Sequence, residues 1–167
     1  STFIAWGAAT RGGSLLHGRN FDFPGIGVWD AAPTIVFCSP DEGLRYGYVG
    51  TAGADVPGVT AFNEAGIVLS AHTRLHRRVR FDGRTILDLG HRIAQHARCL
   101  DDAIRIARSA PISSSWGLAV SSGRERRAVV LEAHGSDVAV VEPGTGTPWL
   151  TCTNRYRHER TQAEEVL

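Results

Sequence analysis

The fold of this chain is decided by residues 1–24, which read STFIAWGAATRGGSLLHGRNFDFP. Two runs rich in β-forming residues, 1–9 and 14–23, flank the turn sequence Thr10-Arg11-Gly12-Gly13, and this pattern predicts a β-hairpin. A two-residue loop at Arg11 and Gly12 pairs Thr10 with Gly13 and, counting outward, Ser1 with Asp22. Directly opposed residues have Cβ atoms about 4.5–5.5 Å apart. We therefore expect the Asp22 carboxylate to reach the amine or hydroxyl of Ser1.

A serine at a free chain end carries its own general base, because its α-amine can accept the proton of its hydroxyl. The ordinary α-amine pKa of about 7.7–8.0 leaves a useful fraction neutral near physiological pH. Asp22 would orient this amine and stabilise its protonated form. The alternative is an incidental Ser1 and an ordinary strand-end carboxylate at Asp22, and the hairpin pattern leaves both interpretations open.

Four segments carry a resemblance to a known group of enzymes. They are Ser1-Thr2-Phe3, Gly18-Arg19-Asn20-Phe21-Asp22-Phe23-Pro24, Asn63-Glu64-Ala65-Gly66-Ile67 and Thr153-Asn154. In that order they resemble the N-terminal-nucleophile (Ntn) hydrolases of the penicillin acyltransferase (peptidase C45) and choloylglycine hydrolase group. The resemblance implies an α+β fold, a four-layer αββα sandwich, in which residue one, exposed by autoproteolytic processing, attacks an amide or thioester carbonyl. A covalent acyl-enzyme would form, and water or an amine would then take the acyl group.

The resemblance also implies roles for individual residues. Asp22 would bind the α-amine, Arg19 would lie beside the nucleophile, and Asn154 would donate to the oxyanion. His72 and Thr73 occupy the place where the resembling enzymes have a backbone and side-chain contribution to the oxyanion hole. Strict alternation puts Arg19 on the opposite face of the strand from Asp22, so a role for Arg19 requires a β-bulge near Gly18 or Asn20.

Two aromatic residues near the hairpin, Phe23 and Trp29, are interpreted as lining an apolar pocket for the acyl group, with core packing as the alternative. The chain departs from the resembling group in two respects. The usual nucleophile is cysteine, so Ser1 is either natural or a replacement for cysteine. The group's chains are longer and supply a further arginine, so the remainder is either a second chain or has been cut away.

The rest of the chain predicts one domain over residues 1–167. Strands are expected at 33–39, 44–50, 57–62 and 67–71. Helical periodicity begins at Thr85 and again at Asp101, and two helices after several strands suit the outer layer of a sandwich. After a serine linker at 113–115, four strands at 116–120, 128–132, 138–142 and 149–153 are expected to form the second sheet as a meander. Residues 155–167 are interpreted as the start of a helix.

Composition narrows the possible partners. The net charge of +1 favours neither nucleic acid nor a membrane surface, and no cofactor is indicated. His72 and His76 have metal-ligand spacing, but no third ligand is evident. Three widely spaced cysteines predict a reducing, cytoplasmic compartment, with export after removal of a leader left open.

The expected partner is a small acyl amide or thioester, and a homo-oligomer or a second chain completing the fold stays open. A competing hypothesis from another class is a non-catalytic sandwich domain that acts as a binding or regulatory subunit.

Overall fold

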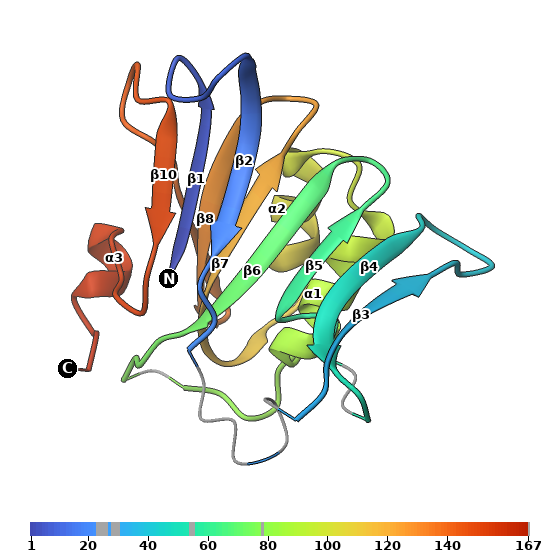
Figure 1. Cartoon of the computed structure of the whole chain (residues 1–167). Coiled ribbons are helices and arrows are strands. Elements are labelled where there is room, and N and C mark those ends of the chain that lie inside the picture. Colours follow the sequence, from blue (N-terminus) through green and yellow to red (C-terminus); the bar gives the residue numbers. More distant parts are fainter. Residues whose placement is uncertain (23–26, 28–30, 54–55, 78, 167) are drawn as a thin grey trace.

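The computed structural model describes residues 1–22, 27, 31–53, 56–77 and 79–166. These residues form layers: a seven-stranded sheet, a three-stranded sheet on one of its faces, and two helices on the other face (Figure 1). Both sheets are antiparallel throughout. The predicted α+β class is therefore confirmed, and the described residues form an α, β, β part of the predicted αββα sandwich.

The large sheet follows chain order: β3 (Pro33–Cys38), β4 (Tyr46–Thr51), β5 (Thr60–Asn63), β6 (Ile67–Thr73), β7 (Ile112–Ser122), β8 (Arg127–Gly135) and β9 (Asp137–Val141). The small sheet has the order β10 (Trp149–Cys152), β1 (Thr2–Gly7), β2 (Gly13–Arg19). The helices are α1 (Ile86–His96), α2 (Leu100–Arg108) and the short α3 (Glu159–Gln162).

The prediction that the last four strands form a separate sheet is wrong. β7, β8 and β9 extend the first sheet through the pairing of β6 with β7, and β10 alone crosses to pair with β1. Strand spacing reveals antiparallel neighbours, but it does not reveal which sheet the last strand joins. The serine run is also not a linker: it lies inside β7, at an irregularity where Ser114 has a φ of 65°.

The register of the first hairpin differs from the prediction. Thr2 pairs with Arg19 and Ile4 with His17, and the Asn20 N–H donates to the Ser1 carbonyl at 2.9 Å. Ser1 therefore lies opposite Asn20, not Asp22. The cause is the loop: pairing closes at Gly7 and Gly13, both with positive φ, so the turn is longer than two residues.

The irregularity in this hairpin lies between Ala5 and Gly7, not near Gly18 or Asn20 as predicted, and the ladder is regular through Arg19. By alternation Arg19 therefore shares a face with its partner Thr2 rather than with Ser1. Thr2 is buried and bonds side chains of the large sheet. Arg19 consequently projects from β2 toward the large sheet. The bulge on which the sequence argument made a role for Arg19 depend is absent, and any role at the site rests instead on the reach of its side chain to the Ala71 carbonyl at the end of β6.

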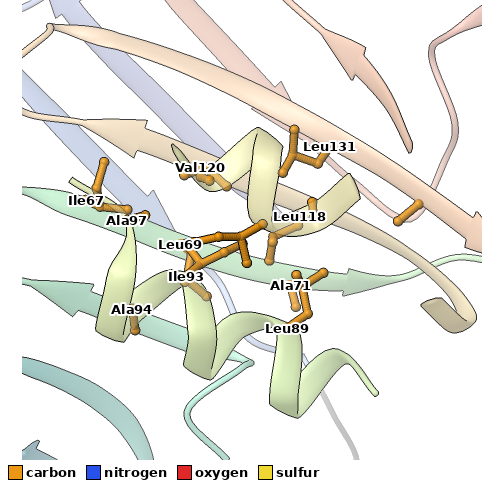
Figure 2. Packing of buried hydrophobic residues seen from close by; sticks show 14 of the residues in the cluster. Ile67, Leu69, Ala71, Leu89, Ile93, Ala94, Ala97, Leu118, Val120 and Leu131 are labelled. Atoms are coloured by element: carbon orange, nitrogen blue, oxygen red, sulfur yellow. The ribbon is translucent and has the colours of Figure 1, made fainter. Parts of the chain in front are cut away.

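The main core lies between the large sheet and the helices (Figure 2). Leu89 and Ile93 of α1 are almost completely buried against Leu69 of β6 and Leu118 of β7. Thr85 caps α1, because its hydroxyl accepts from the Asp88 N–H at 3.2 Å. Both predicted helices are confirmed. Their buried apolar residues recur at helical spacing, which is the pattern that predicted them.

A smaller apolar core joins the two sheets. Ile4 and Leu150 of the small sheet pack on Ala119 and Val130 of the large sheet, and all four side chains are buried. This contact fixes the small sheet over β7 and β8.

Replacing Gly90 of α1 by alanine is not expected to give the stabilisation that this substitution usually gives in a helix. Glycine to alanine in a helix ordinarily stabilises by about 1 kcal/mol. A Cβ at position 90 would, however, lie 2.2 Å from the Cα of Gly58, and overpacking costs about 1–3 kcal/mol. The net of these two effects is an expected fall of about 1 kcal/mol in the free energy of unfolding of Gly90→Ala, measured by urea titration. Gly123→Ala, where the nearest atom would be 3.7 Å away, is the control and is expected to change it little.

Candidate active site

Arg19 reaches across from the small sheet to the open end of the β5–β6 ladder. Its guanidinium donates to the carbonyl oxygen of Val59 and, at 2.7 Å, to that of Ala71. It also lies 4.8 Å from the centroid of the Phe21 ring. Burial lowers the pKa of Arg19 to about 10, so the group remains a cation at neutral pH. Arg19 therefore places a fixed positive charge where β6 leaves the sheet.

Ser1 lies at the same end of the small sheet. Its α-amine donates to the Asn20 carbonyl at 3.0 Å. The Asn20 side-chain amide lies 2.8 Å from both carboxylate oxygens of Asp22. Within the described residues no hydrogen bond joins Ser1 directly to Asp22, so Asn20 links the two: its main chain contacts the amine and its side chain contacts the carboxylate.

Asn154 approaches from the other side. Its side-chain amide donates to the Thr73 carbonyl at 2.8 Å, and an amide nitrogen carries two hydrogens. One donor therefore remains for another acceptor. Thr2 pairs with Cys152, and continuing this register places Thr153 opposite Ser1. Asn154 is thus the residue that follows Thr153, the expected cross-strand neighbour of Ser1.

The main chain of Thr73 offers a second donor. The Ala71 N–H bonds Val59 on the β5 side of β6, and the Arg74 N–H bonds Ser115 on the β7 side. Alternation directs the Thr73 N–H to the β5 side, beyond the last β5–β6 pair, Thr60 with Ser70. The His72 N–H points instead toward β7. Of the two residues predicted for the oxyanion hole, Thr73 has the suitable main-chain direction.

The His72 side chain belongs to a different arrangement, the polar row, which consists of Thr2, His17, Ser70, His72 and Ser121. The Thr2 hydroxyl lies 2.8 Å from His72 Nε2 and 2.8 Å from the Ser70 hydroxyl. His17 continues the row, with Nε2 2.9 Å from Ser70 and Nδ1 2.8 Å from Ser121. The row joins the strand that begins after Ser1 to β6 and β7.

Both histidines of the row are neutral near pH 7. Burial, together with a smaller effect of the nearby Arg19 charge, lowers the pKa of His17 to about 4 and that of His72 to about 3. Each neutral imidazole has one N–H donor and one acceptor nitrogen. Sequence reasoning missed the row; its one local signal is that Ser70 and His72 occupy alternate positions of an otherwise apolar strand.

An apolar cavity of about 410 Å³ opens beside these groups, between the start of α1, the start of β7 and the end of β6. Its lining includes Phe21, Val59 and Ala71, which contact Arg19, and Thr73, which contacts Asn154. Ile86, Leu87 and Trp116 line other parts. The predicted pocket residues Phe23 and Trp29 lie outside the described residues, and sequence reasoning did not identify the lining found here.

The structure separates the two histidines that have metal-ligand spacing. His72 lies in the polar row, whereas the His76 ring stacks on His134 at 3.8 Å between centroids. Across the described ranges, no group of three or more His, Cys, Asp or Glu side chains is arranged to hold a metal ion. No helix in the described part of the chain is long and apolar enough to cross a membrane.

The layered fold is that of the Ntn hydrolases of the penicillin acyltransferase and choloylglycine hydrolase group. Residues 9–167 match the model of the acyl-coenzyme A:6-aminopenicillanic acid acyl-transferase family, and the chain belongs to this family. No curated protein matches the chain in sequence.

Three solved structures show the same fold. An N-acylethanolamine-hydrolyzing acid amidase ortholog from Caenorhabditis elegans aligns at 14% identity with a TM-score of 0.73, covering 98% of this chain and 73% of its own. Penicillin V acylase from Agrobacterium tumefaciens aligns at 17% identity and 0.61, with coverages of 92% and 51%. A variant of conjugated bile acid hydrolase from Clostridium perfringens aligns at 14% identity and 0.67, with coverages of 93% and 54%. This chain therefore spans about half the length of the last two.

The polar row predicts that acid lowers stability. The unfolded chain binds protons at His17 and His72 below about pH 6.5, whereas the folded protein does so only near pH 3–4. Stability is therefore fully present above pH 6.5 and falls as the pH drops through this window. Urea midpoints measured between about pH 7.5 and pH 4 should show the fall. His17→Gln should flatten it, whereas His96→Gln, at an exposed position of α1, should leave the slope unchanged.

Proposed function

We propose that this chain is the nucleophile-bearing part of an amide-bond hydrolase or acyltransferase that works through a covalent acyl-enzyme on Ser1. One observation supports the proposal. Arg19 and Asn154, which lie at or just beyond the strand positions paired with the start of β1, both donate to main-chain carbonyls at the end of β6. Those carbonyls belong to Ala71 and Thr73, which also line the apolar cavity.

The proposed reaction begins with transfer of the Ser1 hydroxyl proton to the α-amine of the same residue. The oxygen attacks the substrate carbonyl carbon, and the oxyanion accepts hydrogen bonds from the free Asn154 amide hydrogen and the Thr73 N–H. Each such donor is typically worth a factor of about 10²–10³ in rate. The intermediate collapses, the C–N bond breaks, and the α-ammonium returns its proton to the leaving amine.

An ester on Ser1 remains, and a second nucleophile removes it. Water gives hydrolysis, and an amine gives acyl transfer, with the α-amine accepting and returning one proton in either case. The guanidinium of Arg19 stabilises the negative charge that develops in both steps. Asp22 acts through Asn20, whose carbonyl orients the α-amine.

The cavity suggests the substrate class. Its lining is apolar, with aromatic side chains at Phe21 and Trp116, so it suits an apolar acyl group and not a charged one. The amine or thiol leaving group would face solvent, where Ser1 is exposed. The named activities of the solved structures, on N-acylethanolamines, penicillin V and conjugated bile acids, support a small acyl amide.

The decisive experiment follows residue 1. The purified mature protein is sequenced from its N-terminus and incubated with acyl amides and thioesters, and the adduct is located by peptide mass spectrometry. We expect an acyl group on residue 1, faster labelling in Ser1→Cys because a thiol is the better nucleophile, and none in Ser1→Ala. Ser14→Ala, on the exposed side of β2, is the control.

Two outcomes would end this proposal. In the first, residues precede Ser1 in the active protein and block its amine. In the second, Ser1→Ala is labelled as fast as the unchanged protein. This result would show that residue 1 is not the nucleophile and would favour a binding or regulatory role for the chain.

The acyl pocket makes a separate prediction. Leu87 lines the cavity from α1 and is 38% exposed, so a larger side chain can enter the cavity without disrupting the core. We expect Leu87→Trp to lower kcat/KM for long acyl chains about tenfold, by removing the room for a few methylenes, and to spare acetyl substrates. Leu75→Trp, at an exposed position away from the cavity lining, is the control. Equal losses for short and long chains would show that the cavity does not hold the acyl group.

A further inference from the structure

A completely buried ion pair lies close to the proposed site but takes no part in the chemistry described above. Arg74 contacts Glu132 at 2.5 Å, and both side chains are 0% exposed. Such pairs are weak contributors to net stability, because desolvation offsets their attraction, although breaking one is costly. Their best-attested use is to specify one arrangement of the chain. The contacts of the pair show which arrangement it specifies here.

Glu132 binds the segment after Asn154. Its carboxylate accepts from the N–H groups of Arg157 at 2.8 Å and His158 at 3.0 Å, and from the Thr161 hydroxyl. All three donors lie within a few residues of one another, at the start of α3. One carboxylate on β8 thereby anchors the chain downstream of Asn154.

Arg74 binds the segment before Asn154. Its Nε donates to the Thr153 carbonyl at 3.2 Å, and its terminal nitrogen lies 3.4 Å from the Cys152 sulfur. Arg74 also directly follows Thr73, whose carbonyl accepts from the Asn154 amide. One guanidinium therefore fixes both the main chain that carries the amide and the strand end that the amide contacts.

We propose that Arg74 and Glu132 are positioning residues that hold the Asn154 amide at the end of β6. This inference rests on the proposed function for its catalytic consequence. The placement of the amide itself is a structural statement that can be tested without activity. Because misplacement of a catalytic group by about 1 Å can cost about a hundredfold in rate, a disturbed pair should slow acylation while Asn154 itself is unchanged.

Gly117 of β7 provides a way to disturb the pair without removing a charge. A Cβ at this position would lie 2.4 Å from Arg74 Nε and 2.5 Å from its Cζ, so Gly117→Ala must displace the guanidinium. Replacing Glu132 itself would leave an uncompensated buried cation, and such a variant can simply fail to fold. Gly123→Ala, just beyond the other end of β7, is the matched control.

The activity test measures the single-turnover rate of acylation of residue 1. We expect Gly117→Ala to lower this rate about 10- to 100-fold with KM changed less than about threefold, and Gly123→Ala to change it less than about twofold. In an Asn154→Ala background the effect of Gly117→Ala should shrink to less than about threefold, because both substitutions act on the same amide. A loss of the same size in both backgrounds would overturn the proposal, since it would show a general effect on the fold.

A second measurement separates this inference from the proposed function. The side-chain amide signals of Asn154 in a ¹⁵N–¹H spectrum, assigned by their absence in Asn154→Asp, report its hydrogen bond to Thr73. We expect them to shift or broaden in Gly117→Ala and to stay in place in Gly123→Ala. If the unchanged protein forms no adduct but these signals move, the proposed function fails and the positioning role stands. Unchanged signals in Gly117→Ala would refute the positioning role, whatever the activity.

Discussion

The candidate active site depends on how the three-stranded sheet packs against the seven-stranded sheet. Toward β8 the contact between the sheets is apolar, with Ile4 against Val130. Apolar contact alone tolerates sliding, because it has no direction. Toward β6 the polar row supplies direction, since Thr2 contacts both Ser70 and His72. Satisfied buried hydrogen bonds of this kind specify a single arrangement, so the strand that begins after Ser1 has one position over β6.

The fully buried Arg74 and the partly buried Arg19 are compensated in different ways at this interface. Arg74 is neutralised by Glu132. Among the described residues no carboxylate pairs with Arg19, whose two terminal nitrogens donate to main-chain carbonyls and to a threonine hydroxyl. A cation compensated only by dipoles leaves a positive potential around it. The positive potential at the site favours negative charge, which suits a reaction that forms an oxyanion. The neighbouring ion pair fixes geometry but adds no net charge.

Local pattern predicted the first hairpin and both helices, because turn residues and periodicity act over a few residues, whereas the layered fold was predicted through resemblance. Local pattern failed where the outcome depends on distant parts of the chain. The register of the hairpin was missed by two residues, because Gly7 and Gly13 close a longer turn than Arg11-Gly12 suggested. Ser1, Arg19 and Asn154 were predicted as neighbours through resemblance. The contact of Arg74 with Glu132 joins residues far apart in sequence, and no local signal predicts it. The polar row has only the alternation of Ser70 and His72 as a local signal, which does not reveal its contacts with His17 and Ser121.

The pairing of Thr2 with Cys152 has a consequence for how the protein is made. β1 emerges from the ribosome long before β10. While the residues between β1 and β10 are still being synthesised, β2 is the one strand of the small sheet that can pair with β1. Contacts between strands this far apart in sequence are slow to form because a large loop must close. Ser1 is therefore carried by an incomplete sheet at first. Its surroundings can form only after the ribosome has translated past Asn154.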